Sequence, residues 1–221
     1  MKIVGLVLSL NGSGCVKFEL DKNLDIINQE YLAFTQVKKN STKDILYFSK
    51  KQFKNDFEQN KWTRDNILSF CKDSEYCAIE DYAFGAKGRV FHIGEGIGLF
   101  KISLYDAGHK LRLYDPCSIK MYACNNGTAD KKTMVDEYDK VRKDPLKLNF
   151  LNRFGSPKED VVDAFFLTEL LQMELKLRKG LIQLKSLTEK QIQIFNRTTK
   201  GNPVNILAKD FYERSSNVPK I

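Results

Sequence analysis

The sequence has no long hydrophobic run, few histidines and no paired-cysteine motif. No stretch reaches the roughly 18 uncharged apolar residues that a membrane-spanning helix needs, and this excludes a helical membrane protein. The two histidines, His92 and His109, lie far apart, and none of the five cysteines forms a CxxC pair. A zinc site and a histidine-based catalytic triad therefore have no support, so a metal site would have to consist of carboxylates.

The N-terminal residues do not have the pattern of a secretory signal peptide. Residues 1–10 are short for a leader and continue into an Asn-Gly turn, which is typical of a first strand. An odd number of cysteines without a leader indicates reduced thiols in the core. We therefore expect an intracellular, cytoplasmic protein with no contact with membranes.

The chain contains enough apolar residues to form a hydrophobic core. The 221 residues are 42% apolar and include 15 Phe and 9 Tyr, which excludes a chain that is disordered throughout. The length suits one large domain, or one domain with a tail.

The positive charge is concentrated near the C-terminus. The net charge is +8, and residues 176–221 alone hold ten basic and three acidic residues, a balance of +7. Such a segment is expected of an arm that binds a polyanion, above all nucleic acid. A solvated tail that is basic only for solubility explains the charge equally well. We divide the chain into a domain of residues 1–178 and a basic C-terminal extension of residues 179–221.

The hydrophobic pattern predicts a mixed α/β domain with a five-stranded sheet. An unbroken apolar run and an alternating segment predict an antiparallel pair of strands, and further strands and helices then alternate. The strands are expected at residues 2–10, 15–20, 30–38, 77–80 and 111–114. The helices are expected at residues 50–72 (from the spacing of Phe53 with Phe57 and Ile67 with Cys71), 93–104 and 156–177, the last opened by a capping box from Ser156 to Glu159.

Three carboxylates could carry metal chemistry. Asp160 and Asp163 lie three apart at the start of a strongly apolar helix, where they would share one face. Glu80 ends a predicted buried strand. Each has a simpler explanation, because acids favour helix N-termini and strand ends often carry polar loop residues. If the three converge, they form an oxygen-only site for Mg²⁺ or Mn²⁺, suited to phosphodiester hydrolysis.

A loop rich in aromatic, glycine and basic residues follows Glu80. Residues 82–91 (YAFGAKGRVF) combine flexible backbone, stacking surfaces and phosphate-binding cations, as a contact with nucleic acid requires. The glycines of Gly94-x-Gly96-x-Gly98 follow no strand directly, so they do not form a phosphate loop. Close helix packing, in particular at a dimer contact, is the better interpretation.

These segments together resemble the RuvC-type Holliday-junction resolvases, in particular those of phages and other viruses. Residues 4–14 (VGLVLSLNGSG) resemble the family's first strand and turn. Its later motifs are similar to residues 78–80 (AIE) with 84–88 (FGAKG), then 118–120 (SIK) with 127–131 (GTADK), and finally 160–164 (DVVDA). The matches follow the family order over residues 3 to about 171.

The resemblance implies an RNase H-like fold, a homodimer and Mg²⁺-dependent nicking of branched DNA such as four-way junctions. By position, Glu80, Asp160 and Asp163 would be metal ligands and catalytic residues. Lys120 and Lys131, eleven residues apart as in the family, would hold the DNA backbone near the scissile phosphate. The remaining DNA contacts would come from Tyr82, Phe84, Lys87, Arg89 and Lys132, with Phe84 as the stacking aromatic and Tyr82 as its competitor.

One residue departs from the family pattern. The family's first strand carries an aspartate where this chain has Val7, and no carboxylate occurs before Glu19. Three functions stay open: a junction-resolving endonuclease with impaired cleavage, a branched-DNA binding protein that has lost catalysis, and an RNase H-like nuclease for another nucleic acid.

Overall fold

The computed structural model describes residues 1–8, 13–38, 41–81, 90–142, 157–199, 202–204 and 206–215. The elements in chain order are β1 (Lys2–Leu8), β2 (Ser13–Leu20), β3 (Ile26–Thr35), β4 (Ile45–Tyr47), α1 (Asp56–Cys71), β5 (Tyr76–Glu80), α2 (Val90–Asp106), β6 (Lys110–Tyr114), α3 (Pro116–Cys124), α4 (Lys131–Arg142), α5 (Pro157–Arg178), α6 (Glu189–Asn196), β7 (Arg197–Thr199) and β8 (Asn202–Val204). Short 3₁₀ helices η2, η3 and η4 cover Lys50–Gln52, Leu184–Ser186 and Ile206–Ala208.

One mixed sheet organises the chain. Its strand order is β4-β3-β2-β1-β5-β6. Strands β1, β2 and β3 are antiparallel neighbours, as predicted, whereas β5 and β6 continue the sheet parallel to β1. The sheet has six strands rather than the predicted five, because β4 adds a three-residue parallel edge beside β3. A strand that short carries almost no periodicity for sequence reasoning to detect.

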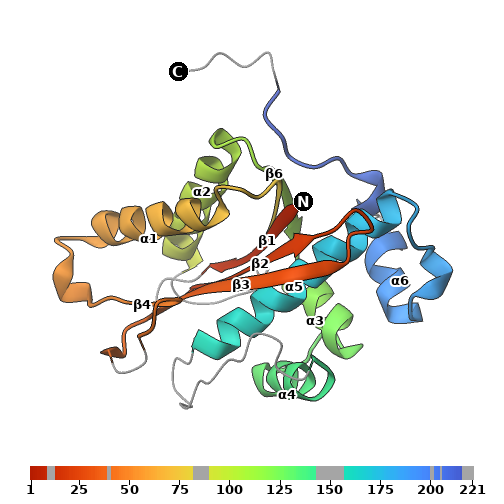
Figure 1. Cartoon of the computed structure of the whole chain (residues 1–221), viewed down its shortest axis with the longest axis horizontal. Coiled ribbons are helices and arrows are strands. Elements are labelled where there is room, and N and C mark those ends of the chain that lie inside the picture. The colour runs from red at the N-terminus through yellow and green to blue at the C-terminus, as the bar shows by residue number, and fades with distance from the viewer. Residues whose placement is uncertain are drawn as a thin grey trace.

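Helices cover both faces of the sheet (Figure 1). Ile3 and Val7 of β1 face the core formed with α3, α4, α5 and α6. Val4 and Leu6 face the other core, which α1 and α2 complete. Because successive strand residues point to opposite faces, a central strand covered on both sides must be apolar throughout, as β1 is.

Two predicted elements have different bounds in the structure. The helix expected over residues 50–72 is a 3₁₀ turn followed by α1, which begins only at Asp56. Phe53 precedes α1 and packs on Phe48 and Trp62, while Phe57 is 85% exposed, so the spacing of these two Phe was not a buried helical face. The third strand spans Ile26–Thr35 instead of residues 30–38, because it pairs with β2 along nearly its whole length.

The thiols follow the prediction only in part. Cys15, Cys71 and Cys77 are buried, Cys124 is partly buried and Cys117 is exposed. Burial raises the pKa of the Cys15 thiol well above its usual value. Among the described residues, no helix combines the length and the apolar character that a membrane crossing demands.

Helix α5 lies directly on β1 and β2 because two glycines permit a close approach. A Cβ atom at Gly5 would overlap Thr168, and one at Gly14 would overlap the backbone of Asp160. The Thr168 hydroxyl donates to the carbonyl oxygens of Ala164 and Val16, 2.6 and 3.2 Å away. These contacts fix both the height and the rotation of α5 over the sheet.

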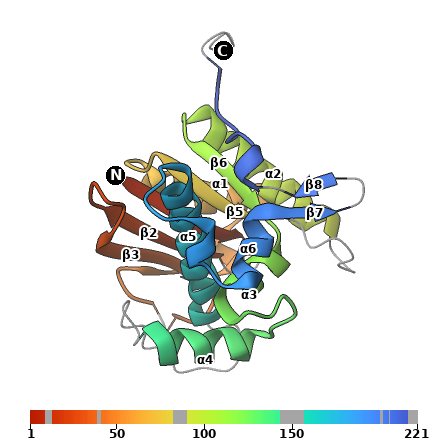
Figure 2. The same ribbon diagram turned by 90° about the vertical axis from the view of Figure 1, so that its right-hand side faces the viewer.

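The residues after α5 are packed onto the domain rather than extended into solvent. Ile194 and Phe195 of α6 and Ile206 of η4 are buried in the same core as α5. In Figure 2, α6 lies beside α3 and α5. We call residues 181–215 the C-terminal unit. A domain boundary at residue 178 stays a prediction, and these contacts argue that the unit is an integral part of the fold.

Two arginines hold the last described residues against β6. Buried Arg112 donates to Glu174 Oε1 (2.7 Å) and to the carbonyl oxygens of Lys209 (2.8 Å) and Asp210 (3.0 Å). Its guanidinium lies 4.2 Å from the Phe211 ring centroid. Arg178 also contacts Glu174, and it donates to the carbonyl oxygen of Ile206 at 2.9 Å. The fully buried Glu174 thus has two cationic partners, and a hydrogen bond from the Tyr114 hydroxyl at 2.5 Å in addition.

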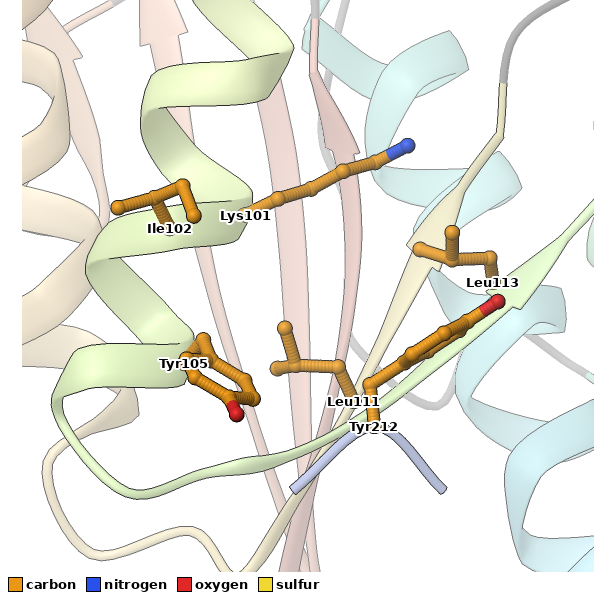
Figure 3. Close-up of a pocket in the computed structure, with 6 residues that line it drawn as sticks. All are labelled: Lys101, Ile102, Tyr105, Leu111, Leu113 and Tyr212. Atoms are coloured by element: carbon orange, nitrogen blue, oxygen red, sulfur yellow. The ribbon is translucent and has the colours of Figure 1, made fainter. Parts of the chain in front are cut away.

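The backbone of Tyr212 completes this attachment. Tyr212 and Leu111 exchange both backbone hydrogen bonds, at 2.8 and 2.9 Å, so the edge strand β6 is partly covered. The side chains of both residues line an open apolar pocket of about 360 Å³ with α2 (Figure 3).

Candidate functional site

The candidate site lies at the carboxyl ends of β1 and β5, beneath the first turns of α5. The parallel register pairs Leu6 with Ile79, and its continuation places Val7 beside Glu80. Val7 packs in the core on the α5 face together with Ala78. Because side chains alternate along a strand, Glu80 points to the same face as Ala78. Val7 and Glu80 are therefore lateral neighbours that both face α5.

The same glycine contact places Asp160 over this pair. Gly14 is the antiparallel partner of Val7 on β2, and the backbone of Asp160 lies against Gly14. Asp163 follows one turn later on the same face of α5. Val7 thus lies between Glu80 on β5 and Gly14 on β2, the residue that the backbone of Asp160 approaches, at the position where the family resemblance expects an aspartate.

Helix α4 brings a lysine to these acids. Asp130 caps α4 by accepting from the backbone N–H and hydroxyl of Thr133, both at 2.7 Å. Lys131 follows in the first turn, where the helix dipole disfavours a cation. Its Nζ lies 3.3 Å from Glu159 Oε2 and 3.5 Å from Asp160 Oδ1. The carboxylates of α5 compensate for that unfavourable position.

Lys120 contributes from α3. Asp115 caps this helix by accepting from the Ser118 backbone N–H at 2.9 Å and the Ser118 hydroxyl at 2.6 Å. The cap fixes where α3 begins, directly after β6, and Lys120 lies one turn further on. Its charge is close enough to lower the pKa of both Glu80 and Asp163.

The pKa values show that the three acids form one electrostatic cluster. Desolvation, followed by repulsion from Asp163 and Asp160, raises the pKa of Glu80 to about 7. Desolvation also raises the pKa of Asp163 to about 6, against the attraction of Lys131. The pKa of Asp160 is raised by burial as well, with Lys131 opposing the shift. Burial and mutual repulsion therefore disfavour the simultaneous ionisation of the three acids, and the two lysines offset this only in part.

We predict that Glu80→Gln stabilises the protein at pH 8. The pKa of Glu80 is about 7 in the folded chain against 4.5 for a free carboxyl, so folding takes up protons between these values. This part of the stability is present below pH 4.5 and is lost as the pH rises through 7. Removal of the charge should raise the free energy of unfolding by about 3 kcal/mol at pH 8, because each unit of pKa difference corresponds to about 1.4 kcal/mol. Thermal unfolding at pH 5 and 8 measures it, with Asp106→Asn on the exposed end of α2 as the control. A Tm that is equally raised at both pH values would contradict the assignment.

The donor types of the cluster suit a hard divalent cation, but the cluster does not form a complete site. Mg²⁺ and Mn²⁺ prefer carboxylate oxygens, which Glu80, Asp160 and Asp163 offer. Within the described ranges, however, no three such side chains are close enough to bind a metal together. Val7 is 5% exposed and supplies an apolar surface where a carboxylate would join β1 to the others. As it stands, this set of residues does not fit the ion.

Several predicted DNA contacts lie outside the described residues. These are Tyr82, Phe84, Lys87 and Arg89, and the same holds for Ser156, the proposed N-cap of α5. Lys132 is described and exposed, and it forms an ion pair with Asp136 on its own helix at 3.7 Å. Its role in DNA binding stays a prediction.

Sequence reasoning missed two contributors to the cluster. The sequence places Glu159 in a capping box, whereas in the structure its carboxylate contacts Lys131. The sequence places Gly14 in a turn, whereas in the structure it allows Asp160 to approach the strand. Glu159 could have been found from the sequence, because it is adjacent to Asp160. The role of Gly14 could not, because it depends on the packing of α5 across β2.

Comparisons with known proteins agree with this arrangement of strands and helices. No protein-family model matches the sequence, and no curated protein does. Among solved structures, Thermus thermophilus RuvC is 14% identical and has a TM-score of 0.53, with 81% of this chain and 96% of that chain aligned. The chain has the fold of the RuvC-type nucleases.

Two further structures support the same fold. Thermus thermophilus RuvC in complex with a Holliday junction substrate is 16% identical, with a TM-score of 0.53 over 82% of this chain and 97% of that chain. The yeast mitochondrial Holliday junction resolvase Ydc2 is 12% identical, with a TM-score of 0.50 over 80% of each. Nearly all of RuvC aligns, whereas about a fifth of the present chain has no counterpart in it.

Proposed function

We propose that this chain is a structure-selective endonuclease of the junction-resolving kind, whose phosphodiester hydrolysis is impaired because Val7 replaces a metal-binding carboxylate. The observation that carries the proposal is the electrostatic cluster of Glu80, Asp160 and Asp163 around Val7. A RuvC-type fold with such a cluster is suited to nucleic-acid hydrolysis, and the solved structures of that fold include one bound to a Holliday junction.

The residues have distinct proposed roles. Glu80, Asp160 and Asp163 would bind Mg²⁺ or Mn²⁺ in a version of the site that has a fourth carboxylate. Lys120 and Lys131 would bind the DNA backbone, because both lie near the carboxylates at which the scissile phosphate would be placed. Tyr82, Phe84, Lys87, Arg89 and Lys132 would supply stacking and phosphate contacts, as their composition suggests.

The second candidate is a branched-DNA binding protein of the same fold without catalysis. It is favoured by the burial of Val7 in a continuous apolar strand, which gives the site a stable packing in place of a ligand. Both candidates predict junction binding. They differ in whether an aspartate at position 7 restores cleavage.

A homodimer and a cytoplasmic location complete the proposal. In α2, a Cβ at Gly96 or Gly98 would meet nothing within 4 Å, so these glycines do not serve helix packing among the described residues. A second copy that packs along this helix would use them, and Ile102 of the same helix is 60% exposed. The proposed location is the cytoplasm, that of the host if the origin is viral.

A comparison of affinities for three DNA shapes tests the proposal. We expect the chain to bind a four-way junction more tightly than a Y-shaped or linear duplex of equal length, with Mg²⁺ and without it. Gel-shift titrations of the three DNAs measure the difference. Equal affinity for all three would contradict selectivity for branched DNA and favour a nuclease-like module for another nucleic acid.

A further inference from the structure

The basic C-terminal unit is attached to the helix that carries Lys120. The Thr188 hydroxyl donates to Asn125 Oδ1 at 3.1 Å, which links the start of α6 to the C-cap of α3. Thr188 also caps α6, since its hydroxyl accepts from the Gln191 backbone N–H at 3.3 Å. Buried Ile194 and Phe195 anchor the other face of α6 in the core. The unit is therefore fixed relative to α3.

The basic residues at the end of α5 and those at the start of the C-terminal unit differ in whether they have acidic partners. Lys176 and Arg178, at the end of α5, pair with Asp25 (2.6 Å) and Glu174 (2.7 Å) and serve the fold. Lys185 and Lys190 are exposed, and in the described part of the chain neither takes part in an ion pair. An exposed lysine without an acidic partner is free to neutralise an external anion.

Lys185 and Lys190 flank the contact between α6 and α3. Lys185 lies three residues before Thr188 and Lys190 two residues after it. Asn125, the partner of Thr188, is five residues from Lys120, which is about 7–8 Å along a helix axis. The two lysines thus lie on the segment that is attached to the C-terminal end of α3, the helix that carries Lys120.

We propose that Lys185 and Lys190 form a second DNA-contact surface, which binds the phosphates of a duplex arm that leaves the candidate site over α3. A duplex carries one phosphate per about 1.7 Å of its axis, so an arm that passes Lys120 presents several phosphates to this surface. That the bound polyanion is DNA rests on the proposed function.

The double variant Lys185→Gln/Lys190→Gln tests the surface. Each phosphate contact contributes about −0.9 to the slope of log K against log salt, so we expect a slope smaller in magnitude by about 1.8. When the salt concentration rises from 50 to 200 mM, the affinity of both proteins for DNA falls. The factor by which it falls should be roughly ten times smaller for the variant than for the parent. The ratio of junction to linear-duplex affinity should stay the same, because phosphate contacts do not read branching.

The matched control is Lys54→Gln/Lys72→Gln. These exposed lysines flank α1 on the opposite face of the sheet and change the net charge equally. An unchanged slope in the test variant, or an equal decrease in the control, would overturn the proposal. A parent chain without preference for junctions would refute the proposed function, while a selective loss of slope would still support the surface.

Discussion

Replacing Val7 by aspartate is expected to create divalent-metal binding and to switch on nicking of four-way junctions. Without metal, the new carboxylate would be buried beside Glu80, Asp160 and Asp163, whose pKa values are already raised. The variant should therefore unfold at a lower temperature than the parent in a chelating buffer. Mg²⁺ or Mn²⁺ should reverse this loss, because a cation that binds only the folded state stabilises it.

Two measurements separate binding from catalysis in this variant. The Tm measured at increasing Mn²⁺ concentration reports metal binding. Single-turnover cleavage of a labelled junction reports catalysis, and we expect a cleavage rate roughly 100-fold or more above that of the parent. Val7→Asn is the matched control, since asparagine has nearly the same shape as aspartate but carries no charge. A folded Val7→Asp variant that binds no metal and cleaves no junction would favour the binding-only function.

Removal of the C-terminal unit is expected to unfold the domain. A chain that ends at Gly180 lacks three buried apolar residues, Ile194, Phe195 and Ile206. It also deprives Arg112 of the carbonyl oxygens of Lys209 and Asp210, and it exposes the edge of β6. Each large buried side chain is worth about 2–5 kcal/mol, and a domain of this size is stable by only about 5–15 kcal/mol.

A second truncation and a point variant make this prediction testable even where the short chain does not fold. A chain that ends at Arg214 keeps all of these contacts and should unfold with the Tm of the parent. Phe195→Ala should lower the free energy of unfolding by about 3–5 kcal/mol in urea titrations. A chain ending at Gly180 that folds with parental stability would instead establish residues 1–178 as an independent domain.

The sequence was sufficient for the central part of the fold. The apolar run of β1 indicated a strand covered on both faces, and the alternation in β2 indicated its antiparallel partner. The sequence also singles out Glu80, Asp160 and Asp163 as candidate ligands, because Glu80 ends a buried strand and the two aspartates share a helix face, and their role as ligands stays a prediction. In each case the information is local, within about one turn or one strand.

The contacts that the sequence did not predict are formed across the fold. Arg112 and Glu174 are 62 residues apart, and Arg112 and Asp210 are 98 apart, so no local spacing indicates that they meet. By composition the basic C-terminal segment fits a polyanion-binding arm and a solvated tail equally well, and its few apolar residues are the ones that anchor it. Composition reports how many charges a segment has, whereas tertiary packing decides which of them remain available.

The most direct test of the account is single-turnover cleavage of a four-way junction by the unmodified chain in Mg²⁺. Native gels of the same samples report the fraction of DNA bound. We expect the junction to be bound by the unmodified chain with its strands intact over a time in which the Val7→Asp variant nicks it. Mg²⁺-dependent nicking by the unmodified chain that is abolished by Asp163→Asn would contradict it, because three carboxylates would then suffice.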